Sequence, residues 1–470
     1  MSEAPGRNVT GAEEPRPRPD AFDPADATGH GSLDHDGRPM ARQPIWHLVR
    51  ISAYWLGISA VWSGVLDILS NRLQYTGIVA KGSEGAGAFE IAFLGTFIAI
   101  AVQPTVGTIS DYTITRWGRR KPYIFIGALL DVIFLWGMAT SNQIWMIAAF
   151  VTLLQFSSNF AQGPFQGYVP DLVPAKQVGI ASGLIGLFGA LGNVMGYAVS
   201  AISLRLSAVD GNAFTYGTMA IGIIEFVTML SVVVGVDEGQ RVKPRNGKSW
   251  FAIAREAWGL DILREKSFLW LVASRFCILC GASIFPIMAT FYLAQVFGLN
   301  ATEAGNVKLL LLAVVGICVI ISVVPASRLS DRIGRKKVIY GSCAAGAIGL
   351  GMGCLAPVLP IAFVGAALFA IAAGSFLAVD WALMSDIVPK ASTGRYMGIS
   401  NVATASAGTV ALLLGGAAVM DSVNHVLGYG TGPRAALALG VGLYVLGAVL
   451  LKPVIERRTE YEAAPAEAAS

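Results

Sequence analysis

Among the charged residues inside long apolar runs of the sequence, three are the leading candidates for chemistry, namely Asp67, Arg275 and Asp380. A charged side chain is costly in an apolar environment, so residues of this kind usually face protein or water and are candidates for function. A carboxylate can accept a proton or hold a cation, whereas a guanidinium can donate to a polar ligand or keep a nearby carboxylate ionised. We expect Asp67 and Asp380 to bind a proton or a cation.

Each of these residues also has a structural interpretation. Asp67 could be an interfacial residue at the end of its apolar segment. Arg275 could pair permanently with a carboxylate such as Asp380 and hold two segments together, or it could donate to a bound ligand. The sequence leaves both pairs of alternatives open.

A stripe of amide side chains follows one face of the apolar segment 144–168. Its members recur at steps of three or four, as on one side of a helix: Gln155, Asn159, Gln162 and Gln166. Amides both donate and accept, which suits the vicinal hydroxyls of a neutral polyol. The alternative is hydrogen bonding between helices, for which Gln and Asn also serve. We expect the stripe to bind a polar ligand.

Three tryptophans lie close to these polar residues in the sequence. Trp55 and Trp62 are seven positions apart and so share a helix face, and Trp381 follows Asp380 directly. An indole can stack on a sugar ring, but packing or anchoring at an interface is an equally good interpretation. We include all three tryptophans among the candidate ligand-binding residues.

The elements that position these side chains follow from composition. The chain has 470 residues, 54% of them hydrophobic and only 14% charged, with a mean hydropathy of +0.60. A soluble domain is about one quarter charged, so a soluble enzyme is excluded. Because one membrane-spanning helix uses about 20 residues, the apolar content suffices for about a dozen spans. The predicted spans lie near residues 47–70, 87–110, 122–140, 144–168, 179–203, 214–235, 268–296, 304–327, 338–356, 360–383, 397–419 and 435–452.

The remaining segments are polar. Residues 1–45 are expected to be a disordered tail, because they have too few aliphatic residues to form a core, and residues 454–470 are expected to be a second polar tail. Residues 237–267 form a basic linker whose middle part, 250–263, suits an amphipathic helix at a membrane surface. Lys and Arg concentrate in every second short loop, which predicts that both termini are cytoplasmic.

An internal repeat divides the chain into two halves, 46–236 and 268–453. Asp171-Leu-Val-Pro recurs as Asp386-Ile-Val-Pro, 215 residues later. A basic motif that begins at Arg116 recurs at Arg332 with an offset of 216 residues. Two independent motifs with nearly one offset indicate duplication, as in membrane proteins whose binding site lies between repeats. We therefore predict an all-α membrane protein of twelve helices in two pseudo-symmetric six-helix bundles.

The repeated motifs combine carboxylates, arginines and a glycine at tight turns between helices. Such a cluster can latch helix ends in one conformation and release them in another, because the carboxylates can pair with the arginines and with helix N-termini. The alternative is that the basic residues only set the topology. The predicted latch residues are Asp111, Arg116, Gly118, Arg119, Arg120 and Asp171 in the first half, and Asp331, Arg332, Gly334, Arg335 and Asp386 in the second.

These motifs resemble those of the major facilitator superfamily, and the resemblance covers about residues 46–453. The first copy, in which four residues separate Asp111 from Arg116, is similar to that of sucrose:proton symporters and glycoside:cation symporters. The run from Asn159 through Gln162-Gly-Pro to Asp171-Leu also resembles these carriers. The resemblance implies twelve helices, transport by alternating access, and a central cavity lined by the first, fourth, seventh and tenth spans.

Two positions depart from the pattern of the sugar carriers. Gln155 stands where they have an acidic residue that takes the coupled proton, and Gln166 stands where they have an arginine. Sucrose as substrate and the proton site of these carriers therefore do not transfer to this chain. Asp131 and Glu225, in the third and sixth spans, are each either a secondary proton site or a partner of a motif arginine.

The leading prediction is a secondary active transporter that carries a sugar, a glycoside or a related polar molecule together with H⁺ or Na⁺. The alternatives are an exporter of a drug or metabolite and a non-transporting membrane sensor or assembly factor on the same fold. The sequence has no nucleotide-binding loop and no metalloprotease or hydrolase motif, so we expect no enzyme activity. We further expect no cofactor or metal besides the coupling ion, no nucleic-acid partner, and a monomer in the cell membrane.

Overall fold

The computed structural model describes residues 42–113, 115–174, 177–238, 247, 249–250, 252, 266–387, 400, 403–404 and 406–454. Most of both predicted tails and of the predicted amphipathic helix lies outside the described residues. The described residues contain twelve helices that are long and apolar enough to cross a membrane. The prediction of an all-helical protein with twelve spans is confirmed.

The first half of the chain, here called the N-half, contains six of these spans and one short helix. They are α1 (Ile45–Tyr75), α2 (Glu84–Ser110), α3 (Lys121–Thr140), α4 (Ile144–Gln166), the short α5 (Tyr168–Leu172), α6 (Val178–Leu206) and α7 (Ala213–Gly235).

The second half, here called the C-half, contains the other six spans. They are α9 (Lys266–Val296), α10 (Ala301–Ile333), α11 (Arg335–Leu355), α12 (Leu359–Ile387), the π-helical η4 (Leu412–Asp421) continued by α14 (Ser422–Leu427), and α15 (Gly432–Leu451).

The two halves pack their helices in the same pattern. In the N-half, α4 lies between α2 and α3, and α7 lies against α1 and α3. In the C-half, α12 lies between α10 and α11, and α15 lies against α9 and α11. Equivalent spans therefore have equivalent neighbours, as the sequence repeat leads one to expect.

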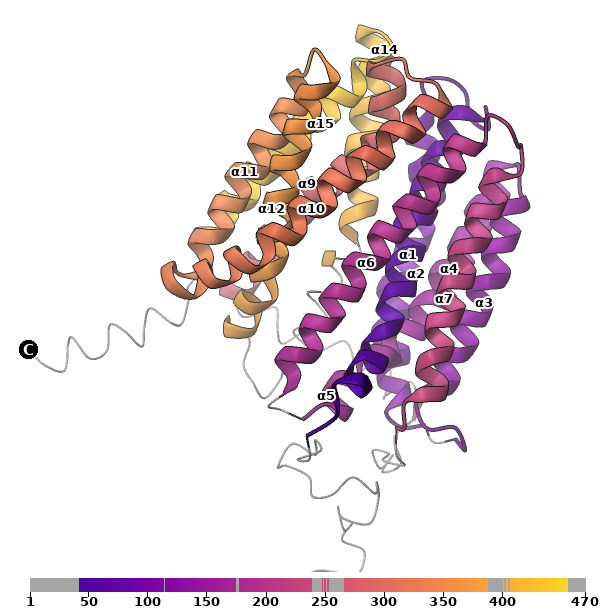
Figure 1. The fold of residues 1–470 in the computed structure, drawn as a ribbon, viewed down its shortest axis with the longest axis vertical. Coiled ribbons are helices and arrows are strands. Elements are labelled where there is room, and N and C mark those ends of the chain that lie inside the picture. The colour runs from indigo at the N-terminus through magenta and orange to yellow at the C-terminus, as the bar shows by residue number, and fades with distance from the viewer. Residues whose placement is uncertain are drawn as a thin grey trace, which may run out of the picture.

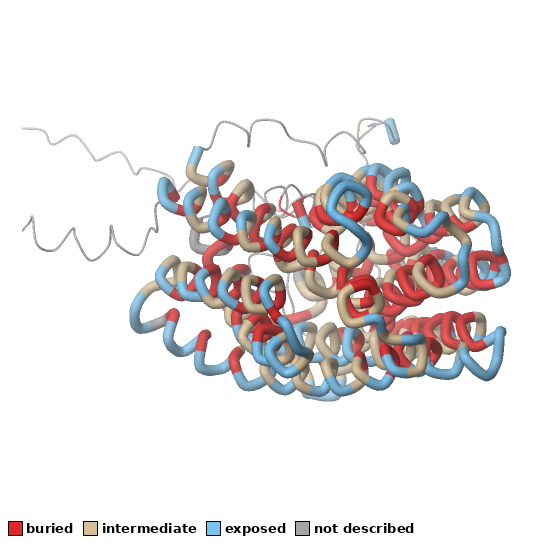
Figure 2. Tube along the Cα trace, turned by 90° about the horizontal axis from the view of Figure 1, so that it is seen from above, coloured by how far each residue is buried: buried red, intermediate tan, exposed pale blue. Residues whose placement is uncertain are grey.

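Apolar side chains cover both the inside and the outside of the helix assembly. Buried residues concentrate where helices face one another, and exposed residues lie on the outward faces and at the loops (Figure 2). On α10, for example, Ile320 and Ile321 are 63% and 65% exposed. A soluble protein avoids such a surface, whereas hydrocarbon chains of a bilayer match it.

The halves meet chiefly at one end of the molecule. Between them, α6 lies against α10, α2 against η4, and α1 against α9. The ribbons of the two halves converge toward the end that carries α14 and diverge toward the end that carries α5 (Figure 1). We call these the α14 end and the α5 end.

Backbone contact at the α14 end is very close. A methyl group in place of the Gly85 hydrogen would lie 2.4 Å from the carbonyl carbon of Gly416, across the boundary between the halves. Beside it, Asp421 accepts hydrogen bonds from the backbone N–H groups of Gly85 at 3.2 Å and Ala86 at 2.7 Å. These are free N–H groups in the first turn of α2, so a carboxylate of the C-half caps a helix of the N-half.

Side chains also join the two halves at the α14 end. The Tyr429 hydroxyl donates to Glu84 at 3.1 Å and accepts from Gln74 at 3.2 Å. Partial burial, together with the nearby Glu84 carboxylate, raises the pKa of Tyr429 above its usual value. The hydroxyl therefore stays protonated and keeps its donor at physiological pH.

Candidate functional site

A buried ion pair joins the two halves. Lys308 on α10 donates from its Nζ to Asp67 on α1, at 2.8 Å to Oδ1 and 2.7 Å to Oδ2. Only 4% of Asp67 and 7% of Lys308 is exposed. Asp67 is therefore a buried residue of the boundary between the halves.

Neutral side chains complete the environment of this pair. Lys308 Nζ also donates to Asn71 Oδ1 at 3.0 Å and to Thr290 Oγ1 at 2.8 Å. Thr290 donates in turn to Asn71, whose amide donates to Ser200 at 2.9 Å. The network thus links α1, α6, α9 and α10, and it provides the paired and hydrogen-bonded surroundings that a buried charge requires.

Lys308 is absent from the residues predicted from sequence. The available signal is a lysine just inside the predicted span 304–327. Lysines near span ends commonly extend to the membrane surface, so their position alone does not indicate function. Only the packing of α10 against the N-half shows that this lysine points inward.

A second buried ion pair lies inside the C-half. Arg275 Nε on α9 donates to both carboxylate oxygens of Asp380 on α12, at 2.9 Å and 2.7 Å. Its Nη1 donates to the backbone oxygen of Ser400 at 3.0 Å and also to the Ser400 hydroxyl. The guanidinium therefore connects α9 to α12 and to Ser400. The side chain of Trp381 lies outside the described residues.

The four amide residues of the α4 stripe have two different environments in the structure. Asn159 donates to the backbone and side-chain oxygens of Gln155, at 2.8 Å and 3.2 Å. The Gln155 side chain packs on α2, where a methyl group on Gly95 would lie 2.5 Å from its Cγ. Gln162 and Gln166, one and two turns further along, are partly exposed. Two stripe members thus contribute to helix contacts, and two retain exposed surface.

The tryptophans of α1 are half-buried. The ring of Trp55 lies 5.9 Å from the ring of Phe165, with a tilt of 48°. Trp55 and Trp62 both pack against the buried cluster that contains Tyr54 and Phe165. Each indole has one face in the protein and retains exposed surface.

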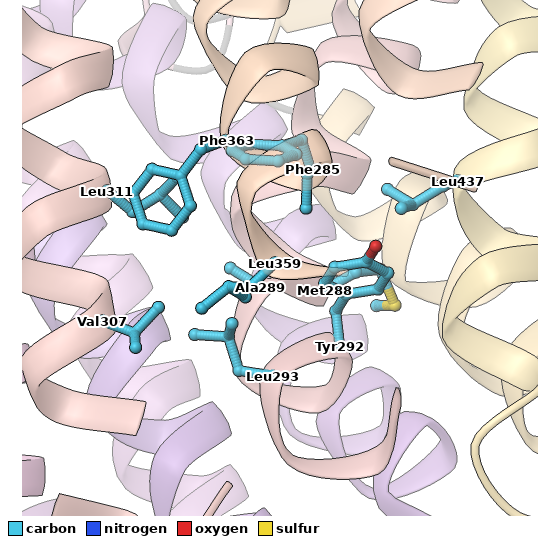
Figure 3. Close-up of a pocket in the computed structure, with 11 residues that line it drawn as sticks. Phe285, Met288, Ala289, Tyr292, Leu293, Val307, Leu311, Leu359, Phe363 and Leu437 are labelled. Atoms are coloured by element: carbon cyan, nitrogen blue, oxygen red, sulfur yellow. The ribbon is translucent and has the colours of Figure 1, made fainter. Parts of the chain in front are cut away.

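An apolar pocket opens between α9, α10 and α12. Phe285, Phe363 and Leu311 line it, and the only oxygen drawn in the close-up is that of the Tyr292 hydroxyl (Figure 3). That hydroxyl already donates to the Gly353 carbonyl at 2.6 Å. The pocket therefore suits hydrocarbon rather than a polyol, and it is separate from both ion pairs.

The predicted latch residues of the N-half come together at the α5 end. Arg120 Nη2 lies 2.8 Å from Asp111 Oδ1 and 2.7 Å from Asp171 Oδ2, and Arg119 also pairs with Asp171. Arg120 Nη1 donates to the Pro164 carbonyl at 2.7 Å. The cluster connects the end of α2, the start of α3 and the α4–α5 junction.

Glu238, which follows α7, belongs to this cluster although the sequence analysis did not select it. It accepts from the backbone N–H of Arg120 at 2.9 Å and from the Tyr168 hydroxyl. Gly118 has φ +115°, and a methyl group there would lie 2.3 Å from Glu238 Oε2. A glycine is thus required both by the backbone and by the space beside Glu238. Arg116 borders a surface pocket next to it.

The C-half copy of the motif is described in part. Gly334 has φ +95° and ends α10, and Arg332 is exposed beside it. Arg335 is half-buried at the start of α11. The side chains of Asp331 and Asp386 lie outside the described residues.

Twelve membrane-length helices in two equivalent six-helix halves, with ion pairs buried between and within the halves, define a membrane transport protein of the major facilitator type. The sequence pattern of the family described as MFS/sugar transport protein matches residues 68–453. The chain belongs to this family, a family of transporters and not of enzymes.

Curated relatives match part of the chain. Sucrose transport protein SUC4 of Arabidopsis thaliana is 31% identical over 169 residues, which cover 32% of this chain and 32% of that protein. A membrane-associated transporter protein of Homo sapiens is 30% identical over 144 residues, or 26% of this chain and 27% of that protein. The chain thus spans about a third of the length of the curated relatives that it matches.

Solved structures share the fold over nearly the whole chain. A D-xylose-proton symporter has a TM-score of 0.64 at 16% identity and covers 88% of this chain and 99% of its own. The nucleoside transporter NupG has a TM-score of 0.63 at 16% identity and covers 87% of this chain and 98% of its own. At these identities the similarity concerns the fold.

Proposed function

We propose that this protein is a secondary active transporter that carries a sugar or glycoside together with a proton or a sodium ion, by alternating access. The observation that carries the proposal is the buried Asp67–Lys308 pair between the halves. It forms where the halves meet, so any movement that opens the α14 end must separate the two charges.

The separated pair has a role in coupling. While the end is closed, Lys308 neutralises Asp67 and the network satisfies both groups. When the end opens, Asp67 loses Lys308 as its partner, and the coupling ion can take the place of the ammonium beside the carboxylate. Asp67 can thus pair either with Lys308, in the closed conformation, or with the coupling ion, in the open one. Because the two exclude each other, binding of the ion is coupled to the conformational change.

The substrate class rests on the relatives and on the chemistry of α4. Several curated relatives are named sucrose transport proteins, and a symporter of D-xylose shares the fold. Gln162 and Gln166 present amides at partly exposed positions, and Trp55 and Trp62 present part of their indoles. Amides and aromatic faces together suit a sugar ring with its hydroxyls.

The test is uptake by the purified full-length protein in proteoliposomes. Labelled mono- and disaccharides are supplied under an inward proton gradient, an inward sodium gradient, or neither. We expect one sugar class to accumulate above equilibrium under one of the gradients and not in protein-free vesicles. Absence of any sugar uptake, together with efflux of another solute, would contradict the proposal and favour an exporter.

The same assay assigns the coupling carboxylate. Asp67→Asn and Asp380→Asn each remove one ionisable carboxyl at nearly constant volume. The variant of the residue that carries the coupling ion should lose accumulation but keep sugar counterflow, which needs no gradient. Unchanged accumulation in either variant removes that residue from the coupling mechanism.

A further inference from the structure

Two carboxyl groups face each other in the interior of the N-half, away from both ion pairs. Asp131 on α3 and Glu225 on α7 are both 0% exposed, and their carboxyl groups are within hydrogen-bonding contact of each other. Ser157 donates to Asp131 Oδ1, and the Tyr54 hydroxyl donates to Glu225 Oε1 at 3.3 Å. The other two oxygens, Asp131 Oδ2 and Glu225 Oε2, are buried without a donor among the described residues.

The helices that carry and flank this pair pack closely together. A methyl group on Gly57 of α1 would lie 2.7 Å from Glu225 Cα, and one on Gly127 of α3 would lie 2.6 Å from the Ser157 carbonyl. At this level α4 and α7 pack against α3, and α1 packs against α7. Within the described part of the chain, the ionisable groups that face either carboxyl are the other carboxyl and Tyr54.

This arrangement is incomplete without a proton. Two ionised carboxylates in contact, buried and without a cation, repel each other and lack solvation, so one of them holds a proton. A single O–H on either group also supplies the missing donor, because it can bond to the unpartnered oxygen of the other group. The unpartnered oxygens and the repulsion between the two carboxylates thus both require one bound proton.

We propose that Asp131 and Glu225 form a shared proton-binding site in the N-half and that this site takes part in coupling. Binding forms an O–H bond on one carboxylate and converts a hydronium ion into water, and release reverses this step. The proton enters from the aqueous phase on one side of the membrane and leaves to the other.

Tyr54 connects this site to the boundary between the halves. It lies on α1, the helix that also carries Asp67, and its 3.3 Å bond to Glu225 is long. A shift or rotation of α1 when the α14 end opens would withdraw this donor and change the affinity of the pair for its proton. This coupling role rests on the proposed function, whereas the shared proton itself does not.

The shared proton is tested by infrared spectroscopy on the purified full-length protein. A protonated carboxyl has a C=O stretching band that an ionised carboxylate lacks. We expect the wild-type protein at neutral pH to show such a band, Asp131→Asn and Glu225→Gln each to change it, and the double variant Asp131→Asn/Glu225→Gln to lose it. Glu90→Gln, which removes an exposed carboxyl of α2, should keep it. A wild-type band that persists unchanged in the double variant overturns the proposal.

Variants that retain both carboxyls protect the test against loss of folding. Tyr54→Phe and Ser157→Ala each remove one donor from the pair and should shift the frequency of the band. An unshifted band in both contradicts the assignment. A bound sodium ion in place of the proton would leave no band and would make accumulation depend on sodium, and that result also overturns the proposal.

Transport tests the coupling role separately. Asp131→Asn and Glu225→Gln should abolish proton-driven accumulation and keep counterflow, while Glu90→Gln keeps both. Accumulation equal to wild type in the pair variants overturns the coupling role while leaving the proposed function intact. If the wild-type protein moves no sugar, the proposed function fails, and the infrared measurement on the same protein still decides whether the proton is shared.

Discussion

Asp67 on α1 and Lys308 on α10 lie 241 positions apart in the chain, yet 2.7 Å separates Asp67 Oδ2 from Lys308 Nζ. Each residue belongs to a different half, and both are almost fully buried. Neutralisation of these charges therefore depends on how the two halves are placed. Several variants can test whether the pair holds the two halves together.

Replacement of the lysine leaves a buried carboxylate without its cation. Removal of one partner from a buried pair costs about 3–5 kcal/mol, so Lys308→Met should lower the thermal unfolding midpoint. It should also favour conformations in which the α14 end is open. Spin labels at Val209 and Val426, which are 86% and 77% exposed and lie in different halves, should then show a longer distance, once the native cysteines are replaced by alanine.

The matched control removes both charges. Asp67→Asn combined with Lys308→Met has no uncompensated charge and should recover most of the stability and of the wild-type distance. A single lysine variant with unchanged stability and distance would mean that the pair does not hold the halves together.

Gly85 allows a test of the same closure without any change in charge. The added methyl of Gly85→Ala would lie 2.4 Å from a backbone atom of Gly416, so α2 and η4 must move apart. We expect a longer distance between the two spin labels and reduced thermal stability. Gly442→Ala is the control, because nothing lies within 4 Å of its added methyl, and its effect should stay within about 0.5 kcal/mol.

The Arg275 guanidinium makes contacts that an ammonium cannot reproduce. Arg275→Lys keeps the charge but cannot reach both Asp380 and Ser400, and the loss of a hydrogen bond to a charged group costs about 1.5–3 kcal/mol. Ser400→Ala removes only the hydroxyl contact and leaves the backbone oxygen as an acceptor for the same N–H group, so a smaller loss of stability is expected. The thermal unfolding midpoint of Arg275→Lys should therefore be lower than that of Ser400→Ala. Equal effects would show that the planar fork of the arginine is not needed here.

The turn at the α5 end depends on Gly118 for two reasons. Gly118→Ala introduces strain at φ +115°, which costs about 1–3 kcal/mol, and also displaces Glu238 from Arg120. Gly428→Ala has comparable strain at φ +103° but meets nothing within 4 Å. The difference between the two variants in thermal unfolding isolates the contact with Glu238. No difference would mean that Glu238 moves aside without loss.

Local pattern was sufficient to predict the architecture. Apolar runs of membrane length predicted the twelve spans, and the repeat of Asp171 at Asp386 predicted that the halves would be built alike. The N-half motif also predicted which groups meet at one turn, since Asp111 and Arg120 are near in sequence and flank the same loop. These features depend on spacing along the chain, which the sequence states directly.

Pairing across the fold was not predictable in this way. The sequence selected Asp67 but not Lys308, and it left Asp131 and Glu225 each open to a motif arginine, whereas the structure places them against each other. It also could not show that Gln155 packs on α2 at Gly95. The sequence by itself thus determined the number of spans, the duplication and the charged residues that needed a partner. Only the tertiary structure decided the partners, because a partner depends on which faces of distant helices meet.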